Sequence, residues 1–159
     1  MILALGSDHA GFDLRQNLAA WAEDQGHTTV QFGATGHDPF DYPDAAAAVV
    51  QAVLSGEADL GALVCGTGIG VCIAANRHRG VRAALACSPQ AAALARQHNH
   101  ANVVCLGART MDPEQAREIF QVFVSTQPDC QERHVRRVRK LDGNDGPSRV
   151  VSIIEEPHG

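Results

Sequence analysis

The sequence predicts an α/β protein, a three-layer α/β/α sandwich around a five-stranded parallel sheet. Short apolar runs alternate along the chain with segments of helical period, which is the pattern of a parallel α/β sheet. The chain has 159 residues, of which 45% are hydrophobic, enough for one domain with a real core and too few for a second. We expect this domain to cover residues 1–141 and to be followed by an extension, 142–159, that is not a separate domain.

The expected strands are five apolar runs at residues 2–5, 29–32, 60–64, 81–85 and 103–106. A first helix is expected from about Gly11 to Gln25, where apolar residues recur every three or four positions, and Gly26 ends it. A second helix should cover residues 44–54 and a short third one residues 71–76. This order of elements is Rossmann-like.

The clearest helix starts come later in the chain. Ser88 and Asp112 each precede a proline, so a capping side chain stands before proline at the first helical position. Residues 129–141 predict a last, very basic helix, and residues 142–147 a turn-rich break. The apolar run 150–154 fits a short edge strand or a packing arm, and its role stays open.

Composition excludes several classes of protein. The N-terminus turns polar too early for a secretory segment, and no apolar run is long enough to cross a bilayer, so we expect a soluble, cytoplasmic protein. The five cysteines are an odd number without Cys-x-x-Cys spacing, which disfavours a disulfide framework and a structural zinc site. We expect most of them to be buried and reduced.

Acidic residues are absent from residues 60–111, although the whole chain has a net charge of −5. The segment holds a glycine turn at residues 65–70 together with eight basic or titratable side chains: Arg77, His78, Arg79, Arg82, Arg96, His98, His100 and Arg109. This asymmetry predicts a local site for a small anion. The acidic net charge and the few aromatic residues argue against a broad nucleic-acid surface.

Ligands of parallel sheets bind where loops leave the carboxyl ends of the strands, because helix N-termini and free N–H groups gather there. The loops expected at that edge carry Asp8 and His9, residues 33–42, the glycine turn, Ser88 and residues 107–109. Polar and titratable side chains should therefore concentrate at one edge of the sheet.

In the glycine turn, Gly66, Gly68 and Gly70 alternate between a strand and a helix, so backbone N–H groups can point at an oxyanion or a phosphate. The spacing is not the dinucleotide fingerprint, since Val71 interrupts it and the nearest downstream acid is Asp112. A tight turn with packing glycines explains the spacing equally well.

A cysteine opens this turn. Cys65 sits where a strand ends and a helix begins, a position that favours a thiolate able to act as base or nucleophile. A cysteine at the end of a buried strand is nevertheless more often part of the core. Cys72, Cys87 and Cys105 are assigned to the core.

A set of short motifs resembles ribose-5-phosphate isomerase type B, within a broader family that includes the galactose-6-phosphate isomerase subunits and related phosphosugar isomerases. The motifs are Asp8-His-Ala-Gly11, Asp41-Tyr-Pro43, Cys65-Gly-Thr-Gly-Ile-Gly70, Ile73-Ala-Ala-Asn76, Arg96-Gln-His-Asn99, Asn102-Val, Leu106-Gly-Ala-Arg109 and Arg133-His-Val-Arg-Arg137. The resemblance covers residues 1–141 in order and register.

The resemblance implies an aldose–ketose isomerase of the pentose phosphate pathway that interconverts ribose 5-phosphate and ribulose 5-phosphate. The reaction moves a proton between adjacent carbons through an enediolate, so its site needs a base, an oxyanion holder and a phosphate grip. By resemblance Cys65 is the base, and the N–H groups of the turn, including Gly66, Gly68 and Gly70, hold the enediolate. Thr67 assists proton exchange. His98 opens the sugar ring, with Asp8 as proton acceptor or orienting group.

The resemblance also implies the substrate contacts and the partners. The phosphate is bound by Arg133, Arg137, His9 and Arg109, since guanidinium groups grip a dianion well. His134 supports them or aids ring opening, while Tyr42, Asp41 and Asn99 border the sugar. Family members form dimers with shared sites, so we expect a homodimer or tetramer in which His98, Asn99 and Arg109 come from the neighbouring subunit. The only small partner is a phosphorylated sugar; no cofactor, metal, nucleic acid or membrane is expected.

Taken without the resemblance, several of these residues have plainer interpretations. His98 would be a helix-end histidine, the basic last helix a solvated face, and residues 41–43 a turn before a helix. Arg136, Arg139 and Lys140 keep the interpretation of a solvated face.

The chain departs from the family pattern at a few positions. Cys72 stands where a small or polar residue is usual, Arg77 replaces a common lysine, and the tail after residue 141 is unmatched. Glu132, which precedes the two arginines, is expected to affect how the phosphate is bound. Pro39-Phe40 is expected to affect which length of sugar fits the site. Some relatives use a glutamate as base.

Other functions remain open at this point. The same Cys65 chemistry could serve a tetrose phosphate or a hexose phosphate such as allose or galactose 6-phosphate. A module that only binds a phosphosugar or nucleotide, and a hydrolase that pairs Cys65 with His98, are alternatives from other classes. A metal enzyme is disfavoured, because His98 and His100 lie two residues apart at a helix end and make a poor ligand pair.

Overall fold

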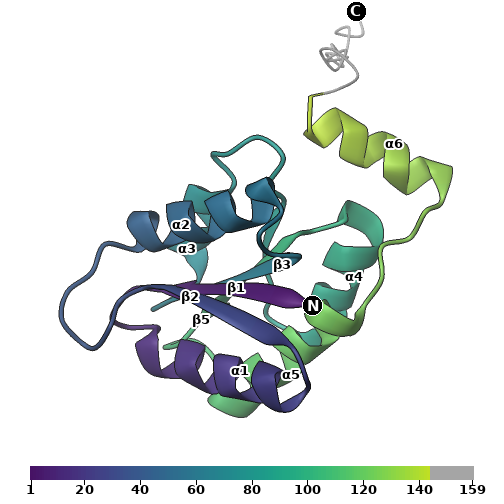
Figure 1. The fold of residues 1–159 in the computed structure, drawn as a ribbon. Helices are drawn as coiled ribbons and strands as arrows, with labels where there is room; N and C mark the ends of the chain where they lie inside the picture. Colours follow the sequence, from purple (N-terminus) through teal and green to yellow (C-terminus); the bar gives the residue numbers. More distant parts are fainter. Residues whose placement is uncertain (144–159) are drawn as a thin grey trace, which may run out of the picture.

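The expected apolar runs form one parallel sheet in the computed structural model, which describes residues 1–143. The strands are β1 (Ile2–Ser7), β2 (Thr28–Gly33), β3 (Leu60–Cys65), β4 (Ala83–Leu85) and β5 (Val103–Gly107), in the spatial order β2-β1-β3-β5-β4 (Figure 1). β4 begins two residues later than predicted, because the N–H of Arg82 donates to the side-chain oxygen of Asn102 and not to a strand carbonyl. The predicted fold class is confirmed.

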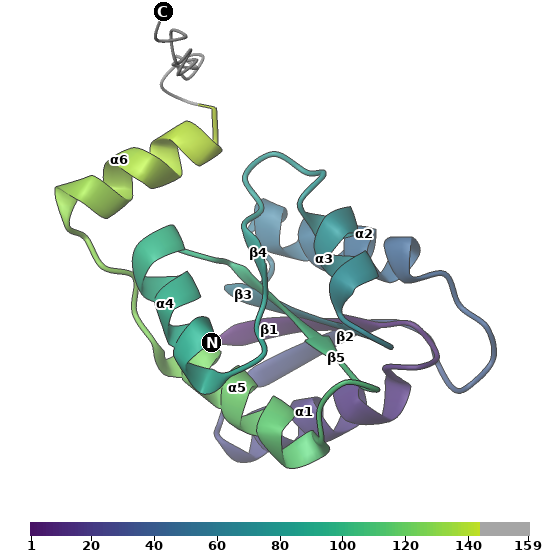
Figure 2. The ribbon, with the colours of Figure 1, turned by 180° about the vertical axis from the view of Figure 1, so that it is seen from behind.

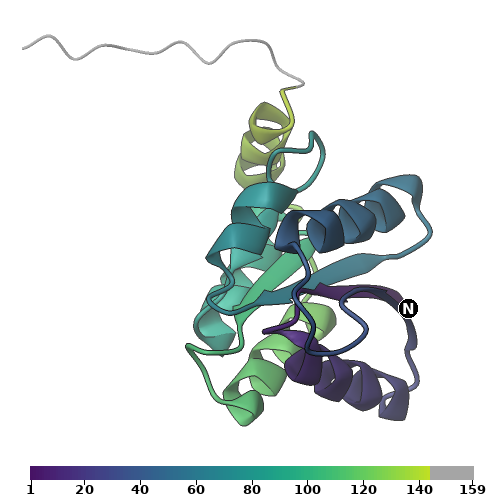
Figure 3. The ribbon, with the colours of Figure 1, turned by 90° about the vertical axis from the view of Figure 1, so that its left-hand side faces the viewer.

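Helices cover both faces of the sheet, which gives three layers (Figure 3). α1 (Phe12–Asp24), α4 (Pro89–Asn99) and α5 (Pro113–Ser125) lie on one face, and α2 (Tyr42–Ser55) and α3 (Ile69–Ala75) lie on the other. α6 (Glu132–Leu141) projects from the sandwich beside α4 (Figure 2).

The core follows from the alternation of side chains along the strands. On β1, Leu3 and Leu5 pack with α1 and α5, whereas Ala4 packs with α2 on the opposite face. All six residues of β3, the central strand, are buried. A buried central strand places its carboxyl end, Cys65, in the middle of the edge where ligands bind.

Most helix boundaries agree with the sequence. Ser88 and Asp112 accept hydrogen bonds from the third residue after them, the N-caps that were predicted. Gly26 has a φ of 81° and follows the end of α1. The last helix starts at Glu132, three residues later than predicted, since the Asp129 side chain accepts the N–H of Gln131 and forms a turn there. Residues 150–154 lie outside the described part of the chain.

The prediction for the cysteines was wrong in part. All five are free thiols, but only Cys65 and Cys105 are buried. Cys72 is half-buried, and Cys87, assigned to the core, is exposed, as is Cys130. Cys87 lies in the turn between the end of β4 and the start of α4, outside the sheet. Within residues 1–143 no helix is long and apolar enough to span a membrane.

Candidate functional site

The glycine turn wraps around the sulfur of Cys65. Cys65 is the last residue of β3 and is 4% exposed, and its Sγ accepts a hydrogen bond from the N–H of Gly68 at 3.1 Å. Gly68 has a φ of 76° and stands immediately before α3, so the turn aims an amide dipole at the sulfur. A donor in this position stabilises a negative sulfur.

Asp8 lies next to Cys65, immediately after the neighbouring strand. It follows β1, its N–H donates to the carbonyl of Val64 at 3.3 Å, and its side chain is 7% exposed. Its Oδ1 accepts the N–H of Gly11 at 2.9 Å. Gly11 is needed for this approach, because a Cβ there would lie 2.6 Å from the Val64 carbonyl oxygen. An acid and a thiol thus share the centre of the carboxyl edge.

His9 is held by the loop that follows β2. Its Nδ1 accepts the N–H of Phe40 at 3.2 Å, which leaves Nε2 as the nitrogen that carries the proton in the neutral ring. Arg15 anchors the start of the same loop, since its guanidinium donates to the carbonyls of Phe32 and Ala34 at 2.6 and 2.9 Å. The loop thereby fixes the orientation of His9 and its free N–H.

Arg109 and Tyr42 complete this group. The backbone N–H of Arg109 donates to the carbonyl of Gly66 at 2.8 Å, and a Cβ on Gly66 would lie 3.2 Å from the Arg109 Nη1. Tyr42, the first residue of α2, has its ring against Gly70. Arg109 was expected to reach in from a neighbouring subunit; in the structure it lies against the glycine turn of its own chain. Thr67 is exposed within the turn, and its Oγ1 accepts the N–H of Ile69 at 3.3 Å.

The remaining predicted residues lie elsewhere. His98 and Asn99 are the last residues of α4, and Arg133, His134 and Arg137 are on α6. A helix that follows a parallel strand runs back across the sheet, so α4 starts at the carboxyl edge and ends at the amino edge. The strands between the two edges span on the order of 15 Å. Within one chain the structure therefore divides the predicted site into two groups.

The second group has a defined geometry of its own. The rings of His98 and His134 stack with centroids 4.4 Å apart and planes 4° from parallel. Arg133 Nε lies 3.2 Å from Nε2 of His134, which is 3% exposed. Burial lowers the pKa of His134, and the charges of His98, Arg133 and Arg137 lower it further, against a smaller opposing effect of Asp129. His134 is therefore neutral at neutral pH, and Arg133 and Arg137 are exposed.

The basic residues of the acid-free segment do not form one anion site. Among its five arginines, Arg109 is at the glycine turn, whereas Arg77, Arg79 and Arg82 follow α3 at the opposite edge. Arg96 is 9% exposed and donates to the carbonyls of Thr126 and Ala101. The acid-free segment therefore does not gather all its charges at one local anion site, since helices α3 and α4 carry most of them away from the glycine turn.

Cys72, on α3, forms a second thiol site. A hydrogen bond from the Cys105 thiol lowers the pKa of Cys72 to about 7, with contributions from the Leu85 backbone and from Asn76, whose Nδ2 lies 3.6 Å from the sulfur. The same hydrogen bond and burial raise the pKa of Cys105 well above its ordinary value. Cys72 is thus a second thiolate candidate that sequence reasoning missed, because its partner lies on a distant strand.

Some contributors to the site have no signal in the sequence. The Phe40 N–H that orients His9 is a backbone group. Gly107 was noted only as part of a loop, but a Cβ there would lie 2.6 Å from the Thr67 carbonyl carbon, so this glycine lets β5 pass the turn. Among the described residues there is no group of three or more His, Cys, Asp or Glu side chains that could hold a metal ion.

The fold defines a class of protein, a three-layer α/β sandwich with a candidate ligand site at the carboxyl edge of its parallel sheet. Comparison with known proteins is more specific. The family model described as Ribose/Galactose Isomerase matches residues 3–141. The chain belongs to this family, which confirms the resemblance seen in the motifs.

Named relatives extend over nearly the same residues. The chain is 38% identical over 139 residues to the ribose-5-phosphate isomerase B of Escherichia coli, which covers 87% of this chain and 93% of the relative. It is also 38% identical over 127 residues to the D-erythrulose-4-phosphate isomerase of Pectobacterium atrosepticum, covering 79% and 83%. A crystal structure of ribose 5-phosphate isomerase from Thermotoga maritima superposes with a TM-score of 0.86 at 45% identity, covering 89% of this chain and 97% of that one.

Proposed function

We propose that this protein is a sugar-phosphate isomerase that interconverts ribose 5-phosphate and ribulose 5-phosphate, with Cys65 as the base. The observation that carries the proposal is the buried Cys65 sulfur, which accepts the N–H of Gly68 beside the buried carboxylate of Asp8. Family membership and the relatives named as ribose-5-phosphate isomerases support the reaction.

The chemistry follows from this geometry. The Cys65 thiolate removes the proton from C2 of the open-chain aldose and returns it to C1, so the pair of electrons moves through an enediolate and no redox partner is needed. Because the Gly68 amide is bonded to the sulfur, we assign the enediolate oxygens to the N–H groups of Gly66, Thr67 and Gly70. Gly70 is in the first turn of α3, where an N–H has no intrahelical acceptor. Each such donor contributes about 3 kcal/mol to barrier lowering.

Asp8 and His98 would open the sugar ring, and His9 with the arginines would hold the phosphate. The Nε2–H of His9 and the guanidinium of Arg109 both belong to the group at the carboxyl edge. His98, Asn99, Arg133 and Arg137 lie at the other edge, too far away to serve the same substrate. We therefore propose a homodimer in which the second group of each copy completes the first group of the other.

A mixing experiment tests the shared site. Cys65→Ser and His98→Asn should each be inactive as purified homodimers. In a hybrid dimer one site carries both changes and the other carries neither. Refolding or co-expressing equal amounts should therefore restore about a quarter of wild-type activity, because half of the dimers are hybrids with one working site. Activity that stays at zero after hybrids are demonstrated would refute the shared site.

Proton transfer by Cys65 is tested in heavy water. Wild-type product should acquire deuterium from the solvent, while Cys65→Ser should lose activity by at least about a hundredfold. Cys72→Ser is the matched control, because it removes the other candidate thiolate and should leave turnover largely intact. Loss of activity in Cys72→Ser with retention in Cys65→Ser would reverse the assignment.

The alternative substrate is a tetrose phosphate, favoured by the relative named D-erythrulose-4-phosphate isomerase. The loop that carries Phe40 and holds His9 sets how far the phosphate lies from Cys65, so it determines which sugar length fits. Comparing kcat/KM for four-, five- and six-carbon phosphates decides between them. Negligible turnover of ribose 5-phosphate beside efficient turnover of another sugar would replace the proposed substrate.

A further inference from the structure

α6 stands apart from the sandwich and yet carries Arg133 and Arg137. A helix that projects from the body has little core to hold it, so its orientation depends on a few specific contacts (Figure 1). Within residues 1–143 the side chain of Val138 is buried in the middle of α6, and the polar contacts gather at the two ends of the segment 129–142.

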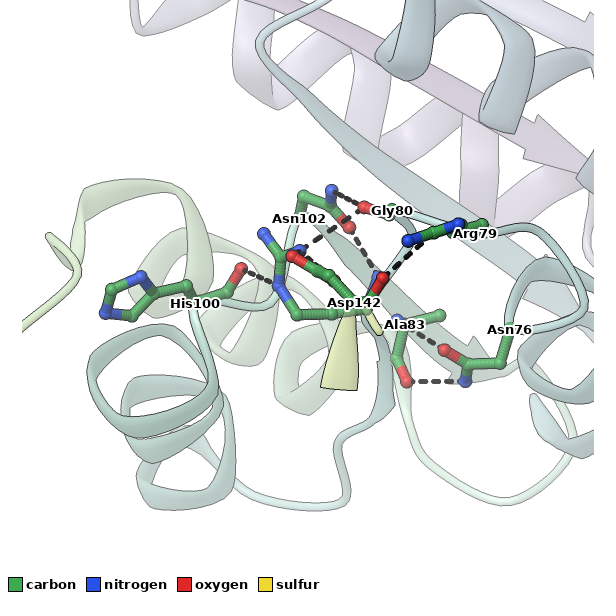
Figure 4. Close-up of polar contacts among 8 residues, drawn as sticks. Asn76, Arg79, Gly80, Ala83, His100, Asn102 and Asp142 are labelled. Carbon is green, nitrogen blue, oxygen red and sulfur yellow. Dashed lines mark hydrogen bonds and ion pairs between the residues drawn. The ribbon is translucent and has the colours of Figure 1, made fainter. Parts of the chain in front are cut away.

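The C-terminal end is held by an ion pair. Nη1 of Arg82 lies 2.8 and 2.9 Å from the two carboxylate oxygens of Asp142, the residue that caps α6. The side chains of Arg82 and Asp142 are 19% and 21% exposed, so the pair is largely shielded from water. Arg79 adds a hydrogen bond from its Nε to the Asp142 carbonyl at 2.9 Å (Figure 4).

The N-terminal end is held by His100. Its Nε2 lies 2.8 Å from the carbonyl oxygen of Asp129, and because a carbonyl only accepts, this nitrogen carries the proton. The N–H of Asp129 donates to the Gln97 carbonyl at 3.0 Å. The stacked rings of His98 and His134 lie immediately beside this contact.

Arg82 joins the two ends. Its Nε donates to the carbonyl of His100 at 3.0 Å, while its Nη1 binds Asp142. Asn102 holds Arg82 in place, since its Oδ1 accepts the Arg82 N–H at 2.8 Å and its Nδ2 donates to the Gly80 carbonyl at 2.9 Å. A continuous path therefore runs from Asp129 through His100 and Arg82 to Asp142, with the turn that follows His98 and Asn99 at its centre.

We infer that Arg82, with Asp142, is a positioning residue that fixes the direction of α6 and so aims Arg133 and Arg137 at the phosphate. The inference rests on the proposed function. If the C-terminal end were released, α6 would pivot about its stacked N-terminal end. A tilt of about 10° would shift the backbone of Arg137, which lies about 4.5 Å along the helix from the stacked His134, by roughly 0.8 Å. Misplacement of this size is enough to weaken a substrate contact strongly.

Arginine is required because two acceptors are bound at once. The Nε and Nη1 groups of Arg82 reach the His100 carbonyl and the Asp142 carboxylate together. A lysine ammonium is a single point on a flexible stem and cannot span both. Arg82→Lys therefore keeps the charge but breaks the path.

Asp142→Asn separates positioning from simple electrostatics. Removing an acid near a phosphate site should tighten phosphate binding if charge alone matters. The positioning role gives the opposite sign: KM for the sugar phosphate should rise about tenfold, with kcat within about twofold, because uniform binding is lost. Arg139→Ala, an exposed change on the same helix outside the path, is the control and should leave KM nearly unchanged.

The experiment measures steady-state kinetics, melting temperature and hydrogen exchange for Arg82→Lys, Asp142→Asn and the double variant. Support requires that both single variants have a raised KM while their melting temperature stays that of wild type. It also requires faster hydrogen exchange in residues 132–141 and no further increase of KM in the double variant. An unchanged or lowered KM in Asp142→Asn would overturn the inference.

The proposed function can fail independently of this inference. If wild type turns over none of the sugar phosphates, calorimetric binding of inorganic phosphate becomes the readout. Weaker phosphate binding in Asp142→Asn than in wild type and Arg139→Ala would then support the positioning role, and equal or tighter binding would refute it.

Discussion

Gly68 is the residue on which the glycine turn depends, and Gly68→Ala tests that dependence. Its φ of 76° is in the left-handed region, which costs about 1–2 kcal/mol for a residue with a side chain. A Cβ would also lie 2.6 Å from Cδ1 of Leu85 and 2.9 Å from the carbonyl carbon of Leu106. The Leu85 side chain can move, but the backbone of β5 cannot, and such overpacking adds about 1–3 kcal/mol.

Gly56 provides a matched control for this substitution. Its φ is 80° and a Cβ there would meet nothing within 4 Å, so Gly56→Ala has the backbone strain without the clash. We expect Gly56→Ala to lower the free energy of unfolding by about 1 kcal/mol and Gly68→Ala by about 3 kcal/mol. Urea denaturation of both variants measures the difference.

Activity should separate the two variants further. Moving residue 68 displaces the N–H that lies 3.1 Å from the Cys65 sulfur, so kcat of Gly68→Ala should fall by about one to two orders of magnitude. Gly56→Ala should keep wild-type kcat. Equal destabilisation of the two variants, together with full activity in Gly68→Ala, would show that neither the clash nor the amide at the sulfur matters.

Three further predictions concern titratable groups. Because the pKa of His134 is lowered, the folded state binds its proton more weakly than the unfolded chain. Stability should fall as pH drops below about 6.5 until the lowered folded value is passed, and His134→Gln should remove that component of the pH dependence of melting. Alkylation of Cys72 by iodoacetamide should rise with pH around a midpoint near its pKa of about 7, and Cys105→Ala should move the midpoint upward. Asp8→Asn keeps the acceptor for the Gly11 N–H, so melting should be unchanged while kcat falls at least about tenfold; normal turnover would exclude Asp8 from the chemistry.

Much of the fold could be predicted from the sequence because it depends on local patterns of residues. Hydrophobic period and proline-flanked caps located the sheet, α4 and α5, as the hydrogen bonds of Ser88 and Asp112 confirm. The start of the last helix was misplaced because the Asp129 turn competes with helix at that point. β4 was predicted too long because the N–H of Arg82 donates to the side chain of Asn102, twenty residues away, a contact that has no signal in the local sequence.

Only part of the candidate site could be predicted from the sequence. Loops at the carboxyl edge, with Cys65, Asp8 and His9, follow from the strand order alone. The contacts that orient these side chains, in contrast, could not be predicted from the sequence. That Phe40 orients His9, that Arg109 lies on its own chain's turn, and that Cys105 acts on Cys72 are long-range contacts without a sequence signal.

By itself, the chain's order of residues determined the α/β class, the family motifs and the chemistry available at the glycine turn, because these depend on neighbours close in sequence. Only the tertiary structure decided that His98, Arg133 and Arg137 lie at the edge opposite Cys65, and that Arg82 ties both ends of α6 to α4. The physical reason is that helix direction and long-range hydrogen bonds, set by packing across the sheet, determine which titratable groups meet.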